Sequence, residues 1–128
     1  MSELYVLDSS AVLCVLTEEE GADIVDNLLS HAIISTVNLT EVIAKLQERG
    51  GTDDVINDSL NDLNLTSVNF DEEQAHQSGR LRTATRSKGL SLGDRACLAL
   101  AASRGAIAVT TDKAWKDFES IARVLLVR

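Results

Sequence analysis

Short apolar runs alternate with longer amphipathic segments along this chain, and no other feature of the sequence restricts its fold more. The apolar runs are rich in aliphatic and β-branched residues, which is typical of strands. They cover residues 5–7, 32–36, 65–70, 107–110 and 123–127. Strands that alternate with helices favour a mostly parallel sheet with helices on both faces. We therefore expect an α/β fold and, because the sequence has no proline, linker or repeat, a single domain over residues 1–128.

The segments between the predicted strands carry helical signals. Over residues 39–46, leucine, valine and isoleucine recur at the i, i+3, i+4, i+7 spacing of a helix face, which a Gly-Gly pair ends. The polar residues 71–87 predict one long helix that Gly89 caps. Residues 91–104 predict another helix, closed by Gly105, and shorter helices are expected between the remaining strands.

Charge and cysteine usage limit the class of protein. The formal net charge of −8 argues against a protein that coats nucleic acid, but it leaves room for a nuclease whose acids hold metal ions. The segment Arg80–Arg95 contains five of the twelve basic residues. Cys14 and Cys97 stand alone in apolar helical contexts, which is typical of buried cysteines in a reducing compartment. Without a secretory signal or a bilayer-spanning run, we expect a cytoplasmic protein with no membrane partner.

Four acidic residues lie near the starts of predicted helices. These four acids are Asp8, Glu41, Asp94 and Asp112. Asp8 and Asp112 follow the first and fourth predicted strands, and Glu41 lies in the helix after the second strand. Because the carboxyl ends of parallel strands share one edge of a sheet, the four acids can face the same edge.

Helix capping is the alternative role for each acid taken alone. Asp8 and Asp112 have N-cap positions, and Asn38–Glu41 and Ser91–Asp94 have the spacing of a capping box. Capping, however, is equally well served by serine or asparagine. Four carboxylates in one crevice would repel one another unless cations neutralise them, and ligands that are all oxygens favour Mg²⁺ or Mn²⁺. The pattern therefore predicts a site for one or two such ions, suited to phosphodiester hydrolysis.

The four acids lie in segments that resemble the PIN domain family, and specifically the VapC toxins of bacterial and archaeal toxin–antitoxin pairs. The segments are LDSSAV, NLTEV, SLGDRACLALA and TTDKAW. One such block alone would be weak evidence. Four blocks in the right order, at plausible spacing and over nearly the whole chain, are specific.

The resemblance implies a three-layer PIN-like fold with a five-stranded parallel sheet of order 3-2-1-4-5 and helices on both faces. It also implies an endoribonuclease dependent on Mg²⁺ or Mn²⁺, the toxin of a toxin–antitoxin module, which cleaves tRNA, rRNA or mRNA and so inhibits translation. The four acids match the family's catalytic, metal-binding quartet, in which we expect Asp8 and Asp94 to be direct ligands. Thr110 matches the supporting hydroxyl, and Ser9 and Ser10 match the polar pair after the first acid.

Partners are also implied by the resemblance. They are an RNA substrate, a second copy of the chain in a homodimer, and a cognate VapB-type antitoxin whose C-terminal segment blocks the active site. A higher assembly with the antitoxin follows, and DNA is expected to be contacted only through the antitoxin. Arg82 and Arg86, four residues apart in the predicted helix 71–87, are candidates for gripping the RNA backbone, although a solvated helix face explains them equally well.

Two alternatives lack RNA cleavage. A phosphoacceptor receiver domain shares the size, the α/β alternation and an acidic magnesium pocket. Receivers, however, require an acidic pair after the first strand, where this chain has Asp8 followed by Ser9 and Ser10. The other alternative is a PIN-like metal-binding module that acts only through protein interaction. A nucleotide triphosphatase is disfavoured, because the chain has no GxxxxGK phosphate loop.

Overall fold

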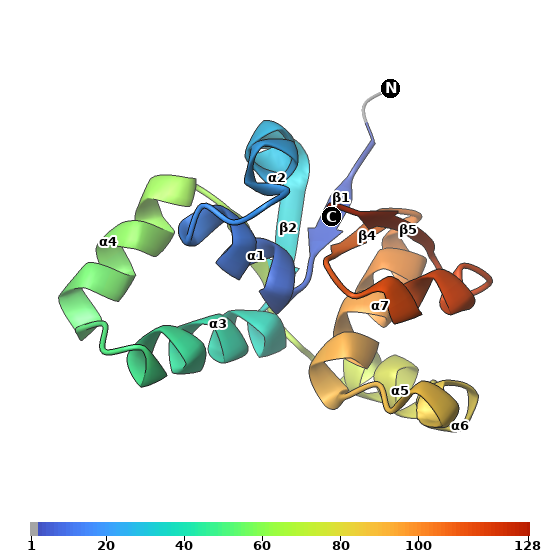
Figure 1. Cartoon of the computed structure of the whole chain (residues 1–128). Helices are drawn as coiled ribbons and strands as arrows, with labels where there is room; N and C mark the ends of the chain where they lie inside the picture. The colour runs from blue at the N-terminus through green and yellow to red at the C-terminus, as the bar shows by residue number, and fades with distance from the viewer. Residues whose placement is uncertain (1–2) are drawn as a thin grey trace.

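The computed structural model describes residues 3–128, which contain a five-stranded sheet with strand order β3-β2-β1-β4-β5 (Figure 1). The strands are β1 (Tyr5–Leu7), β2 (Ala32–Ser35), β3 (Thr66–Val68), β4 (Ile107–Thr110) and β5 (Arg123–Leu126). Every pairing between neighbouring strands is parallel. The α/β class and the order 3-2-1-4-5 are therefore confirmed, and all five carboxyl ends lie at one edge of the sheet.

Seven α-helices and three short 3-10 helices surround this sheet in the part of the chain that the structure describes. The α-helices are α1 (Ser9–Leu16), α2 (Ala22–Leu28), α3 (Thr36–Glu48), α4 (Asp53–Leu63), α5 (Glu72–Arg80), α6 (Arg82–Thr85) and α7 (Leu92–Arg104). The 3-10 helices are η1 (Leu29–His31), η2 (Arg86–Lys88) and η3 (Lys113–Phe118). No described helix is long and apolar enough to cross a bilayer.

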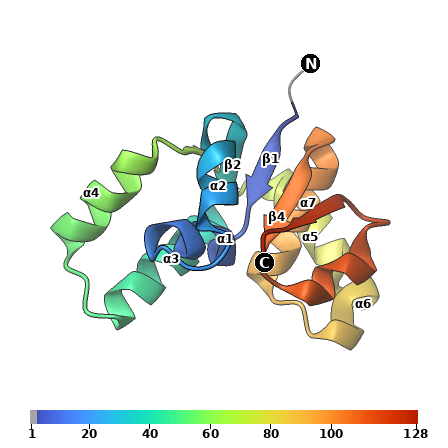
Figure 2. The ribbon, with the colours of Figure 1, turned by 45° about the horizontal axis from the view of Figure 1, so that its top comes forward.

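Successive residues of each strand face two separate apolar cores, as the two-residue period of a strand requires. Val6 packs with α7 and with Trp115 of η3, whereas the next residue, Leu7, packs with α1, α2 and α3. Helices α1 to α4 accordingly lie on one side of the sheet and α5 to α7 on the other (Figure 2). Cys14 and Cys97 lie in different cores, buried and unpaired, as predicted.

The polar segment 71–87 is not the single long helix that the sequence predicts. Helix α5 ends at Arg80, and α6 and η2 follow as separate short pieces. The break has a local cause: Gly79 and the two threonines Thr83 and Thr85 are poor helix formers, and the Thr85 hydroxyl donates to the carbonyl of Leu81 at 2.8 Å. Arg82 lies in α6 and Arg86 in η2, so the prediction that they share one helix face is wrong.

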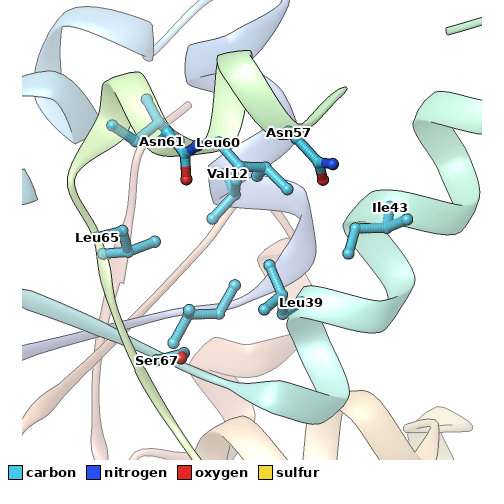
Figure 3. A pocket seen from close by; sticks show the side chains of 10 residues that line it. Val12, Leu39, Ile43, Asn57, Leu60, Asn61, Leu65 and Ser67 are labelled. Atoms are coloured by element: carbon cyan, nitrogen blue, oxygen red, sulfur yellow. The ribbon is translucent and has the colours of Figure 1, made fainter. Parts of the chain in front are cut away.

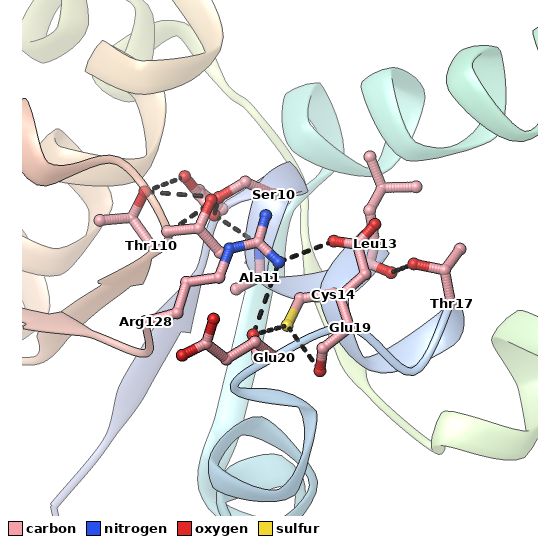
Figure 4. A network of polar contacts seen from close by, with 11 residues as sticks. Ser10, Ala11, Leu13, Cys14, Thr17, Glu19, Glu20, Thr110 and Arg128 are labelled. Carbon is pink, nitrogen blue, oxygen red and sulfur yellow. Dashed lines mark hydrogen bonds and ion pairs between the residues drawn. The ribbon is translucent and has the colours of Figure 1, made fainter.

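The residues that follow β5 contact the end of β4 and the turn before α2. The Val127 backbone N–H donates to the Thr110 carbonyl at 3.2 Å, and Arg128 forms an ion pair with Glu19 at 2.9 Å (Figure 4). Gly21 has a φ of 96°, and a Cβ at this position would overlap the Val127 carbonyl oxygen. Only glycine therefore allows the turn before α2 to approach this closely. These contacts hold Thr110 in place beside β1.

A pocket of about 410 Å³, lined by both apolar and polar side chains, lies between α1, α3, α4 and the strands β2 and β3 (Figure 3). Val12, Leu39, Ile43, Leu60 and Ser67 are among the residues that line it. None of the four acids lines this pocket. The candidate site is therefore defined by the chemistry at the sheet edge and not by this cavity.

Candidate functional site

Asp8 is the most buried of the four acids and lies where β1 ends and α1 begins. It caps α1, because its Oδ1 accepts from the Ala11 backbone N–H at 2.8 Å and from the Ser10 hydroxyl at 2.7 Å. Its Oδ2 accepts from the Thr110 hydroxyl at 2.5 Å. Thr110 ends β4, and the strand order reverses between β1 and β4. Asp8 therefore lies at the switch point where ligands of such sheets bind.

Burial makes the charge of Asp8 unfavourable. The side chain is 3% exposed, and this burial is the main reason that its pKa is raised to about 6. Hydrogen bonds from Thr110, Ser10 and Ala11 oppose the increase, and the negative charge of Asp94 adds to it. Within residues 3–128, no Lys, Arg or His forms an ion pair with any of the four acids. Asp8 is thus a buried carboxylate without a protein counter-charge.

Glu41 lies in the second turn of α3 and contacts the start of α7. Asn38 donates through Nδ2 to Glu41 Oε1 at 3.0 Å and to the carbonyl of Gly93 at 3.1 Å. A Cβ at Gly93 would overlap the Glu41 carboxylate, so this carboxylate packs directly on the Gly93 backbone. Asp94 is the next residue along α7. The contact therefore places two of the four acids side by side.

Asp94 belongs to a capping box at the start of α7, as predicted. Its Oδ2 accepts from the Ser91 backbone N–H at 2.9 Å, and its own N–H donates to the Ser91 hydroxyl at 3.2 Å. Cys97 lies one turn further along α7, and its pKa is raised first by burial and then by three of the four acids. These three are Asp8, Asp94 and Glu41. They therefore act on one region at the start of α7.

Asp112 lies at the rim of this region. Its exposed carboxylate caps η3 by accepting from the Ala114 N–H at 3.0 Å. Its backbone N–H donates to the Thr110 hydroxyl at 3.1 Å, and that hydroxyl also contacts Asp8. Of the serine pair, Ser10 forms the side-chain contacts, which include accepting from the Thr111 N–H at 3.0 Å. Ser9 is the first residue of α1.

One predicted capping box is wrong. Ser35, and not Asn38, is the N-cap of α3, because its hydroxyl accepts from the Val37 N–H at 3.2 Å. The second strand ends at Ser35, one residue earlier than predicted, and Glu41 lies deeper in the helix. The sequence patterns did not indicate Asn38 and Gly93 as residues of the site. The available signal was an asparagine one turn before a candidate acid, which places both on one face of α3.

The donor set fits a hard divalent cation. Among residues 3–128, no three acidic, His or Cys side chains form a preformed cage, so closure around an ion requires side-chain rotation. Asp8, Glu41 and Asp94 offer only oxygen, which suits Mg²⁺ or Mn²⁺. Asp94 caps through Oδ2 and Glu41 accepts through Oε1, so that Asp94 Oδ1 and Glu41 Oε2 are left for a cation. A cation would also balance the buried charge of Asp8.

We expect the metal-free protein to lose stability as the pH rises from about 4 to about 7. The Asp8 pKa is about 6 in the folded state, against an ordinary value of 3.8, so the folded state holds this proton more tightly. Each unit of difference corresponds to about 1.4 kcal/mol, and the charge therefore costs the folded state about 2–3 kcal/mol above pH 6.

Urea unfolding in chelator at several pH values measures this effect. Asp8→Asn is expected to flatten the part of the pH dependence that Asp8 causes. Asp71→Asn is the matched control, because Asp71 is an exposed N-cap of α5. Parallel pH profiles for Asp8→Asn and the wild type would contradict the prediction.

Comparison with known proteins identifies the family. The PIN domain model matches residues 5–122. The chain belongs to the PIN domain family. A sequence comparison with curated proteins finds no match. The strand order also differs from the 2-1-3-4-5 order of receivers, so the receiver alternative is wrong.

Solved structures share this PIN fold at low sequence identity. The VapBC2 complex of Rickettsia felis, bound to a promoter DNA fragment, matches with a TM-score of 0.76 and 18% identity, over 96% of this chain and 98% of the other. A toxin–antitoxin complex from Klebsiella pneumoniae matches with a TM-score of 0.74 and 20% identity, over 97% and 98%. VapC20 of Mycobacterium tuberculosis, a toxin that cleaves the sarcin-ricin loop, matches with a TM-score of 0.71 and 15% identity, over 94% and 96%.

Proposed function

We propose that this PIN domain is an endoribonuclease dependent on Mg²⁺ or Mn²⁺ and the toxin of a toxin–antitoxin module. The observation that carries the proposal is the buried Asp8 carboxylate, which has no protein counter-charge and lies at the β1–β4 switch point. Glu41 and Asp94 act on the same region, so the negative charge there is concentrated. An N-cap with a purely structural role needs neither a buried charge nor other acids nearby, since serine caps a helix equally well.

The four acids have separate tasks in this proposal. Asp8, Asp94 and Glu41 hold one or two ions, and Asp112 completes the cluster directly or through water. A bound ion would polarise the scissile phosphate and activate water for hydrolysis of the phosphodiester bond. Thr110 and Ser10 donate to Asp8 and keep its carboxylate oriented and charged, and Ser9 offers a second hydroxyl at the start of α1.

The partners and location are part of the same proposal. Toxin–antitoxin complexes occur among the solved structures with this fold. We infer that this chain pairs with a VapB-type antitoxin, forms a homodimer and a higher assembly with the antitoxin, and contacts DNA only through it. We further infer that residues 1–128 form one domain and that the protein acts on RNA in the cytoplasm.

Cleavage of total cellular RNA by purified, partner-free protein tests the proposed activity. Cut sites are mapped by end sequencing in Mg²⁺, in Mn²⁺ and in chelator. We expect discrete cuts that disappear in chelator, and their positions will identify the class of RNA. If no RNA is cut although the metal raises the melting temperature, the alternative of a PIN-like binding module replaces the nuclease.

Arg82 and Arg86 are expected to contribute to RNA binding through the phosphate backbone. Both are exposed, and neither forms an ion pair within the described residues. Each phosphate contact to single-stranded RNA contributes about 0.7 to the slope of log K against log salt concentration. In an Asp8→Asn background, Arg82→Ala/Arg86→Ala should therefore bind more weakly and make this slope shallower by about 1.4, which is two contacts at about 0.7 each.

The matched control for this double variant is Arg49→Ala/Arg104→Ala, which removes the same charge from exposed positions outside the segment Arg80–Arg95. A salt slope that falls equally in both double variants would assign the effect to net charge and not to this segment.

A further inference from the structure

Asn38 is a buried polar side chain that joins two of the helices carrying the acids. It lies in α3, is 1% exposed, and donates both to Glu41 Oε1 and to the carbonyl of Gly93 in α7. Both partners are acceptors. Exchanging the positions of Nδ2 and Oδ1 would direct an oxygen at two other oxygens, so the contacts permit only one orientation of the amide.

These two hydrogen bonds use the whole donor capacity of the amide. The Asn38 Oδ1 atom, by contrast, is buried and has no hydrogen-bond partner within residues 3–128. Leaving a buried acceptor unpaired is unfavourable, and an apolar side chain at this place would avoid that penalty. The asparagine at this position is therefore explained by the hydrogen bonds that its Nδ2 donates to Glu41 and Gly93, and not by packing alone.

The hydrogen bond from Asn38 Nδ2 opposes the electrostatic repulsion between the Glu41 carboxylate and the neighbouring acids. The negative charges of Asp8 and Asp94 act on the same region as that of Glu41. Like charges favour a glutamate side chain that swings out toward water, and Glu41 is only partly buried. The hydrogen bond from Asn38 opposes this movement, while the Gly93 contact fixes Asn38 itself to α7.

We propose that Asn38 is a positioning residue that holds the Glu41 carboxylate at the start of α7, ready to bind the ion together with Asp94. This inference rests on the proposed metal-dependent function. Partners that orient metal ligands typically change metal affinity by 10- to 100-fold. Loss of the Asn38 amide should therefore weaken Mn²⁺ binding about tenfold.

Calorimetric titration of the full chain with Mn²⁺ tests the inference without relying on activity. The variants are Asn38→Ala, Glu41→Ala and the double variant, with Val42→Ala as the matched control. Val42 is fully buried in the same helix, so its truncation destabilises α3 without touching a polar contact of the site. Melting temperatures in chelator are recorded for all variants.

We expect Asn38→Ala to weaken Mn²⁺ binding and Val42→Ala to leave it unchanged. In the Glu41→Ala background, Asn38→Ala should have no further effect, because its target is gone. If Asn38→Ala binds Mn²⁺ like the wild type, or if Val42→Ala weakens binding equally, the positioning role is overturned while the proposed function stands. If the wild type itself binds no Mn²⁺, the proposed function fails and the inference fails with it.

Discussion

Asp8→Asn is expected to abolish RNA cleavage and, at the same time, to stabilise the metal-free protein. The substitution removes the buried charge that we propose binds the ion, so cleavage should fall by about 10³-fold. It also removes the cost of keeping that charge in an apolar site, which is about 2–3 kcal/mol at neutral pH. The amide oxygen can still accept from the Ala11 N–H, and the amide nitrogen can donate to Thr110, so the cap is retained.

The two effects have opposite signs, and this separates a functional role from unfolding. A variant that merely disrupted the fold would lose activity and stability together. Cleavage of a mapped RNA site in Mg²⁺ and the melting temperature in chelator measure the two effects. Asp71 caps α5 and is remote in sequence from the four acids. Asp71→Asn should therefore leave cleavage unchanged and should not raise the melting temperature in chelator. Wild-type cleavage by Asp8→Asn, or a lower melting temperature in chelator, would refute the assignment.

Capping and ion binding are compatible roles for the same side chain. Asp8 uses Oδ1 for the α1 cap, and Oδ2 contacts Thr110 across the β1–β4 boundary. Asp94 caps α7 with Oδ2 only. The caps fix these carboxylates near the edge of the sheet, and each cap uses only one of the two carboxylate oxygens. Local helix chemistry thus positions the groups that the proposed reaction needs.

Features with short-range causes could be predicted from the sequence. The strands follow from apolar runs, and the caps at Asp8 and at Ser91–Asp94 follow from residue type and spacing. The strand order 3-2-1-4-5 came from the resemblance and not from periodicity. Period and capping rules act over a few residues, so they carry no information on how distant strands pair.

Features with long-range or competing causes could not be predicted. Asn38 and Gly93 are 55 residues apart, and no local pattern links them. Asn38 has the sequence spacing of an N-cap because it lies three residues before Glu41, but Ser35 is the residue that caps α3. The polar segment 71–87 has too weak an apolar face to show that its helix breaks after Arg80. A contact between distant residues decides the first case, and competing local signals decide the other two.

Gly93→Ala is expected to lower cleavage by about 10²-fold with little change in stability. The added methyl group would overlap the Glu41 carboxylate, which is the far end of a flexible side chain. Glu41 can therefore swing away and relieve the overlap without unfolding α7. Alanine is also the better helix former, by at most about 1 kcal/mol at this position in the first turn, and this gain opposes the cost of the lost contact. What the variant loses is the placement of Glu41 beside Asp94.

Gly79→Ala is the matched control for this substitution. Gly79 lies in α5, and a Cβ there would meet no atom within 4 Å, so the same change should stabilise the protein and leave cleavage intact. Cleavage rates on one mapped RNA and melting temperatures in chelator compare the two variants directly. If Gly93→Ala cleaves like the wild type, the Glu41 carboxylate is not needed at the start of α7. If it loses activity only in proportion to its stability, Gly93 matters for the fold and not for the site.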